Sequence, residues 1–277
     1  MILEELISYV ERFQLGEFGR ELISSTKTAI QLRPKHSFES FDNGSRFGGR
    51  PFAKNDFAWP LSGNFRGVRR DHEEHQYIVG PLRFICQILV ADLPRVPDGL
   101  EGEFSDDDLI LFFAATNKFY FPDTGCSGRD WQIVVSSRSS GRLHTPPKLP
   151  EGFNEAMLDS SSPLYNESVL LPACAIEFVE YAQIDPSLLY GRAEVPNDVD
   201  PYSLQKDPLH LLGGYANHRI SPVADFAGSK LGVSTLEVSC LAQFESDISL
   251  HLSWAGRGVG FFMMATGDPE NNILVTH

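Results

Sequence analysis

Three short patterns occur twice in this chain in the same order, and this internal repeat constrains the fold more than any other feature of the sequence. Each copy has an apolar residue before two adjacent glycines, then an apolar run with one glutamine, then a run with two adjacent phenylalanines. Their spacings shorten from 39 and 25 residues to 30 and 18, as expected if loops diverge while strands persist. We therefore predict a diverged duplication. The patterns occupy residues 45–51, 84–88 and 112–116, and then 210–215, 240–244 and 261–266.

The repeated residues also predict local geometry. Adjacent glycines permit positive φ angles or a close backbone approach at a turn. The single glutamines, Gln87 and Gln243, are predicted to lie on equivalent strands of the two halves. A buried glutamine has up to four hydrogen-bonding positions to satisfy, so we expect each one to bond to loop backbone. The alternative is that both glutamines contact a ligand from equivalent positions.

The N-terminus is predicted to be helical. Apolar residues at spacings of three and four over 2–13 indicate an amphipathic helix, with Gly16 as its stop. A second helix is predicted from about Glu17 to Ile30. Pro34 then ends helical structure, because proline disfavours helical geometry in the residue before it.

The rest of the chain reads as strands and long loops. The clearest alternation places Ile248, Leu250, Leu252 and Trp254 on one face of a half-buried strand. Gly, Pro and Ser clusters at 136–150 and 185–208 indicate long loops. We predict an α+β fold in which two N-terminal helices precede a β-rich body of two pseudo-repeated, mainly antiparallel halves. The single domain 1–277 divides into helices (1–31), a first half (32–150) and a second half (151–277). Further strands are expected at 84–90, 109–115, 131–135, 236–241 and 258–264.

Composition excludes several classes of protein. With 42% hydrophobic residues in 277, the chain can bury a sizeable core and is not disordered. No apolar run approaches the roughly 20 residues that a membrane helix needs. The N-terminal residues are acidic where a signal peptide would be basic. Four scattered cysteines do not form a disulfide scaffold, so we expect a cytoplasmic protein without a membrane partner.

The charge of the chain is unevenly distributed. The formal net charge is −14, yet residues 1–75 hold 11 acids and 11 bases. Residues 92–108 hold seven acids and one base, and residues 151–200 hold ten acids and one base. Such a field repels a phosphate backbone, which disfavours direct nucleic-acid binding, and it attracts basic proteins. The alternative is that the acidic excess only keeps the protein in solution.

Several of these segments match the motifs of a known family. The segments are residues 45–51 followed by 59–60, residues 81–88 followed by 92–94, residues 210–215, and residues 241–247. Through them, from about Leu32 to the C-terminus, the chain resembles the YwqG-like proteins, a bacterial domain of unknown function. It lacks the proline that usually follows the first motif, and its acidic middle diverges. The resemblance implies an α+β fold with two similar β-rich halves and no established catalytic centre. It also implies a genomic neighbourhood of toxin genes, with some relatives serving as immunity proteins.

The polar motifs of the chain do not carry a recognisable catalytic pattern. His72 and His75 could ligate a metal from one helical turn, but their order is not that of a zinc protease and their basic neighbours indicate a solvated loop. Cys126 is the only plausible nucleophile, and the acids beside it oppose thiolate formation. The glycines at 256–260 precede a strand, so they indicate a hairpin turn rather than a phosphate loop. We expect no metal, no cofactor and no catalytic residue.

These observations favour a non-enzymatic immunity protein that binds and neutralises a cognate basic toxin of the nuclease type. An acidic inhibitor can cover the surface with which such a toxin holds phosphates. One alternative function is a small-molecule hydrolase or transferase with a cleft between the two halves, and another is a structural or regulatory scaffold with no toxin. The predicted partner-binding residues belong to a loop between two core strands. They are Glu101, Glu103, Asp106, Asp107 and Asp108.

Overall fold

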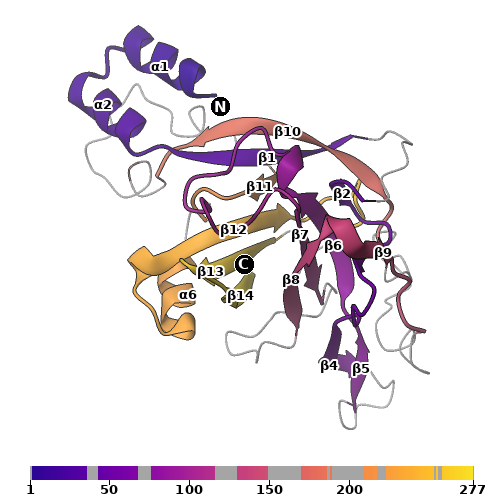
Figure 1. The fold of residues 1–277 in the computed structure, drawn as a ribbon. Helices are drawn as coiled ribbons and strands as arrows, with labels where there is room; N and C mark the ends of the chain where they lie inside the picture. The colour runs from indigo at the N-terminus through magenta and orange to yellow at the C-terminus, as the bar shows by residue number, and fades with distance from the viewer. Residues whose placement is uncertain are drawn as a thin grey trace.

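The fold is that of a computed structural model, in which two helices precede a large antiparallel sheet (Figure 1). Helix α1 (Leu3–Arg12) and helix α2 (Gly16–Ser24) lie beside one end of β1 and β10. This order confirms the predicted arrangement of two N-terminal helices before a mostly antiparallel strand-rich body. None of the described helices is long and apolar enough to cross a membrane. The structure describes residues 2–35, 43–67, 76–115, 130–148, 170–185, 188, 209–216, 223–252, 254 and 258–276.

Within the described residues, ten strands form one sheet in which all neighbouring strands run antiparallel. The long pair β1 and β10 occupies the middle, with four strands on each side. In spatial order the strands are β14 (Asp268–Thr276), β13 (Val259–Ala265), β12 (Val238–Glu245), β11 (His210–Leu212), β1 (Lys27–Lys35), β10 (Cys174–Gln183), β2 (Arg46–Phe47), β6 (Arg83–Leu89), β7 (Asp108–Ala114) and β8 (Trp131–Ser137).

The sheet has a first wing, made of β2, β6, β7 and β8, and a second wing, made of β11, β12, β13 and β14, on either side of the central pair. Smaller elements cover the two wings differently. One face of β6 and β7 packs under the segment that contains β3, whereas the corresponding face of β12 and β13 packs under α6. The smaller elements are β3 (Phe52–Lys54) paired with β9 (Gly141–Leu143), β4 (Leu61–Gly67) paired with β5 (Gln76–Pro81), α6 (Val223–Leu231), and the short 3-10 helices η1 (Val90–Asp92), η2 (Arg138–Ser140) and η3 (Thr235–Glu237).

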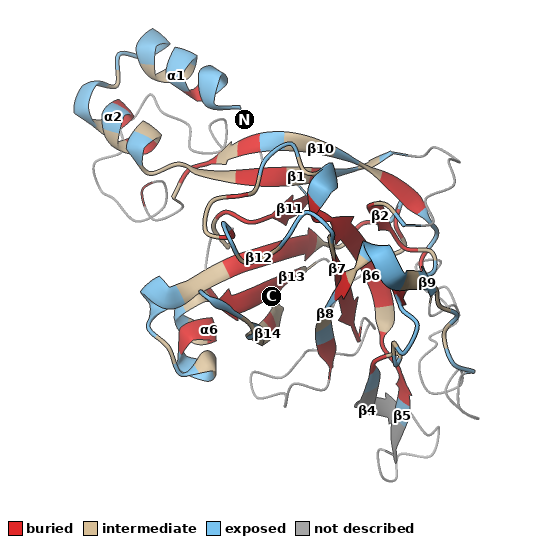
Figure 2. Ribbon diagram, viewed as in Figure 1, coloured by how far each residue is buried: buried red, intermediate tan, exposed pale blue. Residues whose placement is uncertain are grey.

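The main core lies on the other face of the sheet, where the two wings meet. Phe112 of β7 packs edge-on against Phe244 of β12 and Phe262 of β13, with ring centroids 5.3 and 5.1 Å apart. The edge strands also approach each other, because Trp131 Nε1 of β8 donates to Asn272 Oδ1 of β14 at 3.1 Å. Figure 2 shows this interior as the most continuously buried part of the molecule. The two wings therefore share one core.

The second helix is shorter than predicted. We expected helix to Ile30, but α2 ends at Ser24 and β1 begins at Lys27. The hydroxyls of Ser25 and Thr26 stabilise this helix end, because each donates to a carbonyl of the last helical turn at 2.9 Å. Pairing of β1 with β10 along its whole length then outweighs any local helical preference. The predicted stop at Pro34 is also wrong, since Pro34 lies within β1.

The clearest predicted strand, 248–254, is wrong as well. Residues 248–251 form a turn, which is closed by two backbone bonds between Asp247 and Leu252 at 2.8 and 3.0 Å. His251 has φ +54°, a left-handed conformation that no strand contains. Of the four alternating residues, Leu250, Leu252 and Trp254 are nevertheless buried, whereas Ile248 is exposed.

The other strand predictions are confirmed at their centres. The structure has β6, β7, β8 and β13 where strands were expected, each within one residue at either end except that β8 continues two residues further, to Ser137. The expected strand at 236–241 begins two residues later, because η3 occupies its start, and it continues to Glu245. The loop expected at 136–150 contains η2 and β9. Most of the loop expected at 185–208 lies outside the described residues.

Candidate functional site

The acidic segment, residues 92–108, joins η1 to β7 and packs across β1 of the central pair and β11 of the second wing. Asp98 N donates to the carbonyl of Thr28 at 3.0 Å, and the Asp98 carboxylate accepts from Thr28 N at 2.7 Å. Pro97 covers Gly213, the residue after β11. These contacts hold the segment against β1 and β11, so its backbone is fixed by the body of the protein.

The five predicted partner-binding carboxylates all lie on this segment, three exposed and two half-buried. Glu101 accepts locally from Gly99 N at 2.7 Å, while Glu103 accepts from Gly267 N at 2.8 Å in the turn between β13 and β14. Asp108 begins β7 and accepts from Ser105 N at 2.8 Å. The remaining two are the exposed pair Asp106 and Asp107.

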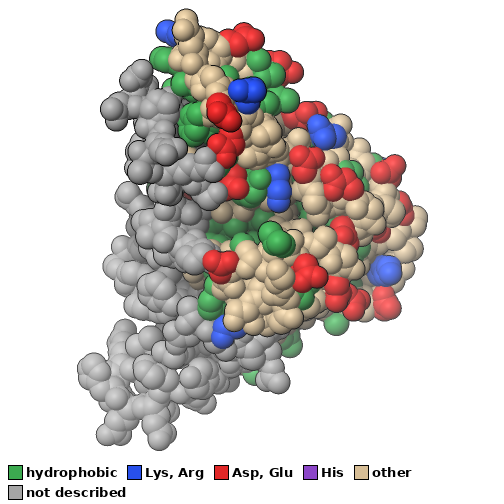
Figure 3. Space-filling model, turned by 90° about the vertical axis from the view of Figure 1, so that its left-hand side faces the viewer, with side chains coloured by type: hydrophobic (Ala, Val, Ile, Leu, Met, Phe, Trp, Pro, Cys, Tyr) green, Lys and Arg blue, Asp and Glu red, His purple; other side chains and the backbone are tan. Residues whose placement is uncertain are grey.

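The electrostatics of the acidic segment are dominated by unneutralised carboxylates. Its single base, Arg95, forms an ion pair with Asp98 at 3.4 Å, and the described residues contain no ion pair of the five predicted carboxylates. The hydroxyl of Ser137 donates to Asp107, and this bond holds the pKa of Asp107 below its usual value. Figure 3 shows one face of the molecule, where acidic side chains gather along the margin on the right. This segment can therefore attract cations, and its fixed backbone presents the charge in one geometry.

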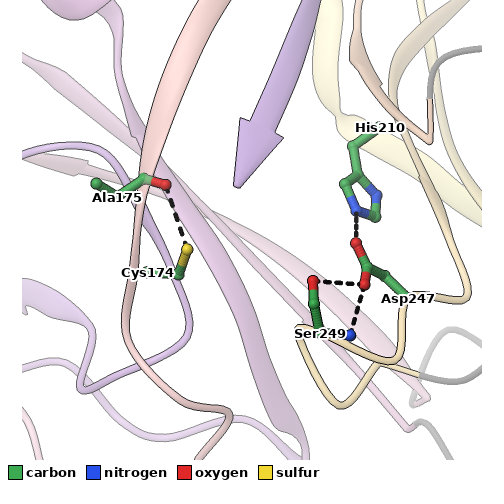
Figure 4. A network of polar contacts seen from close by, with 5 residues as sticks. All are labelled: Cys174, Ala175, His210, Asp247 and Ser249. Carbon is green, nitrogen blue, oxygen red and sulfur yellow. Dashed lines mark hydrogen bonds and ion pairs between the residues drawn. The ribbon is translucent and has the colours of Figure 1, made fainter. Parts of the chain in front are cut away.

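A polar pair, His210 and Asp247, is buried between the wings. His210 begins β11 and is fully buried, and its Nε2 lies 3.2 Å from Asp247 Oδ2 (Figure 4). The other carboxylate oxygen of Asp247 accepts from both the amide and the hydroxyl of Ser249 at 2.7 Å. The rings of Phe47 and Phe244 flank the imidazole, with centroids 5.1 and 6.1 Å away.

The charge state of this pair follows from its surroundings. Burial lowers the pKa of His210 by more than Asp247 raises it, so the imidazole is neutral and carries its proton on Nε2. The bond from His210, together with those from Ser249, holds the pKa of Asp247 well below its usual range despite burial. Nδ1 of His210 is buried without a hydrogen-bond partner among the described residues.

The first wing has a counterpart built from different residues. Ser45 precedes β2 as His210 begins β11, each three residues before its paired glycines. Its hydroxyl donates to Asp92 Oδ2 at 2.8 Å and accepts from Leu89 N, also at 2.8 Å. Asp92 follows the glutamine strand β6 as Asp247 follows β12. The repeated order of these residues was visible in the sequence, but nothing in it indicated that they bond in pairs.

The buried cysteines are unsuited to nucleophilic chemistry. Figure 4 shows Cys174 across from the His210–Asp247 pair, with its thiol directed at the carbonyl of Ala175 at 3.5 Å. Burial raises the pKa of Cys174, raises that of Cys86 well above its usual value and raises that of Cys240 to about 12. A thiol is a poor nucleophile in such surroundings. The fourth cysteine, Cys126, lies outside the described residues.

The prediction for Gln87 is confirmed in its contacts. Gln87 is fully buried on β6, accepts from Phe52 N at 2.9 Å and donates to the carbonyl of Gly44 at 2.7 Å. Its side chain therefore ties the loop at Gly44 and the start of β3 to the sheet. Gln243 is buried on β12, as expected.

The remaining predicted motifs give no site in the described part of the chain. The described ranges contain no group of three or more His, Cys, Asp or Glu side chains placed to hold a metal ion. The paired histidines His72 and His75 lie outside these ranges, as do residues 255–257 of the glycine-rich segment.

Comparison with known proteins gives the family of the chain. Residues 45–272 match the family described as domain of unknown function DUF1963, and the chain belongs to that family. The matched region begins at Ser45 and includes both polar pairs and the whole acidic segment. No curated protein matches the sequence.

Proposed function

We propose that this protein is a non-enzymatic immunity protein of the cytoplasm, which binds and neutralises a cognate basic toxin of the nuclease type. The observation that carries the proposal is the acidic segment 92–108, a run of seven acids and one base on a fixed backbone. The resemblance to YwqG-like proteins, some of which are immunity proteins, supports the same function. Membership of a family of unknown function is compatible with it.

The physical basis of the proposed function is electrostatic complementarity. A nuclease binds phosphates through a basic surface, and an acidic inhibitor that covers this surface excludes the nucleic acid. Long-range attraction accelerates the encounter, and the effect weakens as salt screens the charges. A fixed segment loses little conformational entropy on binding, which favours affinity. Residues Glu101 and Asp106 supply exposed charge without an internal counter-ion among the described residues.

The decisive experiment measures association kinetics with the purified product of the adjacent gene at two salt concentrations. The test variant neutralises the five predicted carboxylates as E101Q, E103Q, D106N, D107N and D108N. We expect association at low salt to slow about tenfold and its salt dependence to weaken. An unchanged rate would exclude this segment as the recognition surface, and an absence of binding by the wild type would overturn the immunity function.

A matched control separates a local effect from a general loss of charge. It neutralises five other exposed carboxylates on α1, α2 and β10, which removes the same net charge from other surfaces. If the control slows association as much as the test variant, the acidic segment has no special role. The substitutions in the control are E4Q, E11Q, E17Q, E177Q and E180Q.

We also propose that the two wings are the diverged halves of a duplication. The order of the strands supports this, because it is the same when read from either edge towards the central pair β1 and β10. The hydrogen bonds agree: Gly48 N donates to the Ile85 carbonyl at 2.8 Å, and Gly213 N donates to the Leu241 carbonyl at 2.9 Å. Each accepting residue lies two positions before the glutamine of its strand.

The alternative enzymatic function has less support. It requires a cleft between the halves, and the described residues at that place include the buried rings of Phe112, Phe244 and Phe262 in mutual contact. The buried thiols have raised pKa values, as described above. We therefore propose a binding protein and no cofactor.

A further inference from the structure

The His210–Asp247 pair connects two segments that are 37 residues apart in the sequence. Asp247 closes the turn 247–252, which joins β12 to the segment leading into β13, by exchanging two backbone bonds with Leu252. Its side chain also caps the amide of Ser249 inside the turn. The remaining oxygen reaches His210 on β11, so one carboxylate shapes the turn and joins it to the sheet.

We propose that the His210–Asp247 pair is an acid-sensitive latch, which holds the turn 247–252 on β11 at neutral pH and releases it at mildly acidic pH. The latch is independent of the proposed toxin-binding function. It concerns a buried pair at the end of the shared core, whereas the proposed partner contacts the acidic segment.

The latch follows from the geometry of the imidazole. Neutral His210 donates one bond, from Nε2 to Asp247, and is otherwise surrounded by the rings of Phe47 and Phe244. A second proton would have to sit on Nδ1, which has no acceptor among the described residues. A buried donor without an acceptor and a buried charge both cost free energy, which opening of the turn relieves by admitting water.

The direction of the pH effect can be derived from linkage. Burial lowers the pKa of His210 below its ordinary value of about 6.5, so the open state binds more protons than the closed state as the pH falls below that value. The closed turn is therefore fully stable above about pH 7 and loses stability as the pH falls. Asp247, whose pKa is also lowered, adds to the loss only below about pH 4.

Few other titratable groups act on this histidine. Asp247 is the only described charged group with an electrostatic effect on His210. From β10, burial and the charge of Asp247 both raise the pKa of the Cys174 thiol, which is therefore neutral below pH 7. From β2, Arg46 precedes Phe47 and donates to the carbonyls of Gly44 and Arg50. Glu245 ends β12, and His251 lies within the turn itself.

The experiment measures amide hydrogen exchange of the native chain between pH 5 and pH 7.5, expressed as protection factors. We expect the amides of Ser249 and Leu252 to lose protection by up to tenfold per pH unit below about pH 6.5. The amide of Leu89, which is bonded to the Ser45 hydroxyl in the first wing, should keep its protection. Constant or rising protection of the turn at acidic pH would overturn the latch.

Two variants assign the effect to one residue. His210→Gln places an amide donor near the position of Nε2 without a titrating group, and should abolish the pH dependence. His251→Gln removes the imidazole that lies within the turn and should leave the dependence as in the wild type. A pH dependence that survives His210→Gln, or disappears with His251→Gln, would contradict the proposal.

A measurement on the wild type covers the case in which His210→Gln does not fold. The imidazole proton resonance of His210 can be followed by NMR over the same pH range. The latch requires His210 to stay neutral while the turn is closed and to gain its proton only as the turn opens. A histidine that gains its proton while the turn stays protected would overturn the proposal.

Discussion

In the two wings of the sheet, corresponding strands are tied together by different chemical groups. In the first wing a hydroxyl from Ser45 bonds to Asp92, and in the second an imidazole from His210 bonds to Asp247. Both pairs join the start of a short strand to an aspartate in the segment that follows the glutamine strand. The comparison teaches that corresponding positions can be bonded in the same way by different residue types, and that only the second pair contains a group able to titrate near neutral pH.

The wings also differ on their outer faces. Residues around β3, such as Phe57 and Trp59, pack on Phe113 of the first wing, with ring centroids 5.8 and 5.6 Å away. In the second wing α6 performs this covering role, with Ala227 fully buried against the cluster around Phe261. One apolar sheet face therefore accepts either an irregular aromatic segment or a helix, because the hydrophobic effect is not directional.

The largest expected effect tests whether the wings are separate units or share one core. Phe244→Ala removes a ring that touches Phe47 and Phe112 of the first wing and Phe262 of the second. We expect a loss of about 4 kcal/mol in the free energy of unfolding, measured by urea denaturation. Amide exchange should show protection falling in both wings together.

An exposed phenylalanine provides the control for this substitution. Phe13 follows α1 and is 40% exposed, so Phe13→Ala should cost less than about 1 kcal/mol. If Phe244→Ala lowered protection only in β11 to β14, the wings would be independent units and the shared core would not hold them together.

The second prediction compares the paired glycines of the two wings. Gly48 has φ +54°, and an added Cβ would lie 2.3 Å from the Pro172 carbonyl oxygen. Gly213 has φ +72°, with Pro97 Cβ at 2.2 Å. We expect Gly48→Ala and Gly213→Ala each to cost about 3 kcal/mol, from backbone strain and overpacking together, measured by urea denaturation.

Gly102 separates the two contributions. It has φ +79° but nothing within 4 Å of an added Cβ, so Gly102→Ala should cost only about 1 kcal/mol of backbone strain. A small effect at Gly213 beside a large one at Gly48 would show that a proline ring yields where backbone does not, and that the second wing is the looser of the two.

The third prediction concerns the buried glutamine of the first wing. Gln87→Leu keeps the volume of the side chain but leaves Phe52 N and the Gly44 carbonyl without their partner. We expect a loss of about 2 kcal/mol in unfolding free energy, with the fold retained. Amide exchange at Phe52 should rise by more than exchange at Leu111, which pairs with Gln87 through backbone alone. Equal increases at both amides would indicate that the sheet itself had loosened.

Strand positions could be predicted from the sequence where burial and local pattern agree. The apolar runs of β6, β7 and β13 are buried on both faces, and such runs are recognisable without knowledge of their partners. The bonding of Gln87 to loop backbone was predictable for the same reason, since a lone amide in an apolar strand has few other ways to be satisfied.

Other elements depend on distant partners and could not be predicted locally. Strand β1 forms because it pairs with β10, which is distant in the sequence. The turn 247–252 depends on the side-chain bonds of one aspartate, Asp247. The phenylalanine pairs appeared equivalent, yet Gln87 lies opposite Leu111 and Gln243 lies opposite Phe261. The proposed repeat is therefore displaced by one residue there, and only the register of the strands reveals the displacement.

The smallest expected effect tests how the acidic segment of the first wing is held on the second. Glu103 accepts from Gly267 N at 2.8 Å, a bond that spans 164 residues and joins the segment to the turn between β13 and β14. Glu101 accepts from Gly99 N within the segment itself. Because a half-exposed bond to a carboxylate is partly replaced by water, Glu103→Ala should cost about 1 kcal/mol of unfolding free energy. Glu101→Ala should cost only about 0.3 kcal/mol, since its bond is local and its side chain is exposed. Both values can be measured by urea denaturation at two salt concentrations. Equal costs would mean that the segment is held by backbone contacts such as that of Asp98 with Thr28, and that Glu103 is as free to meet a partner as Glu101.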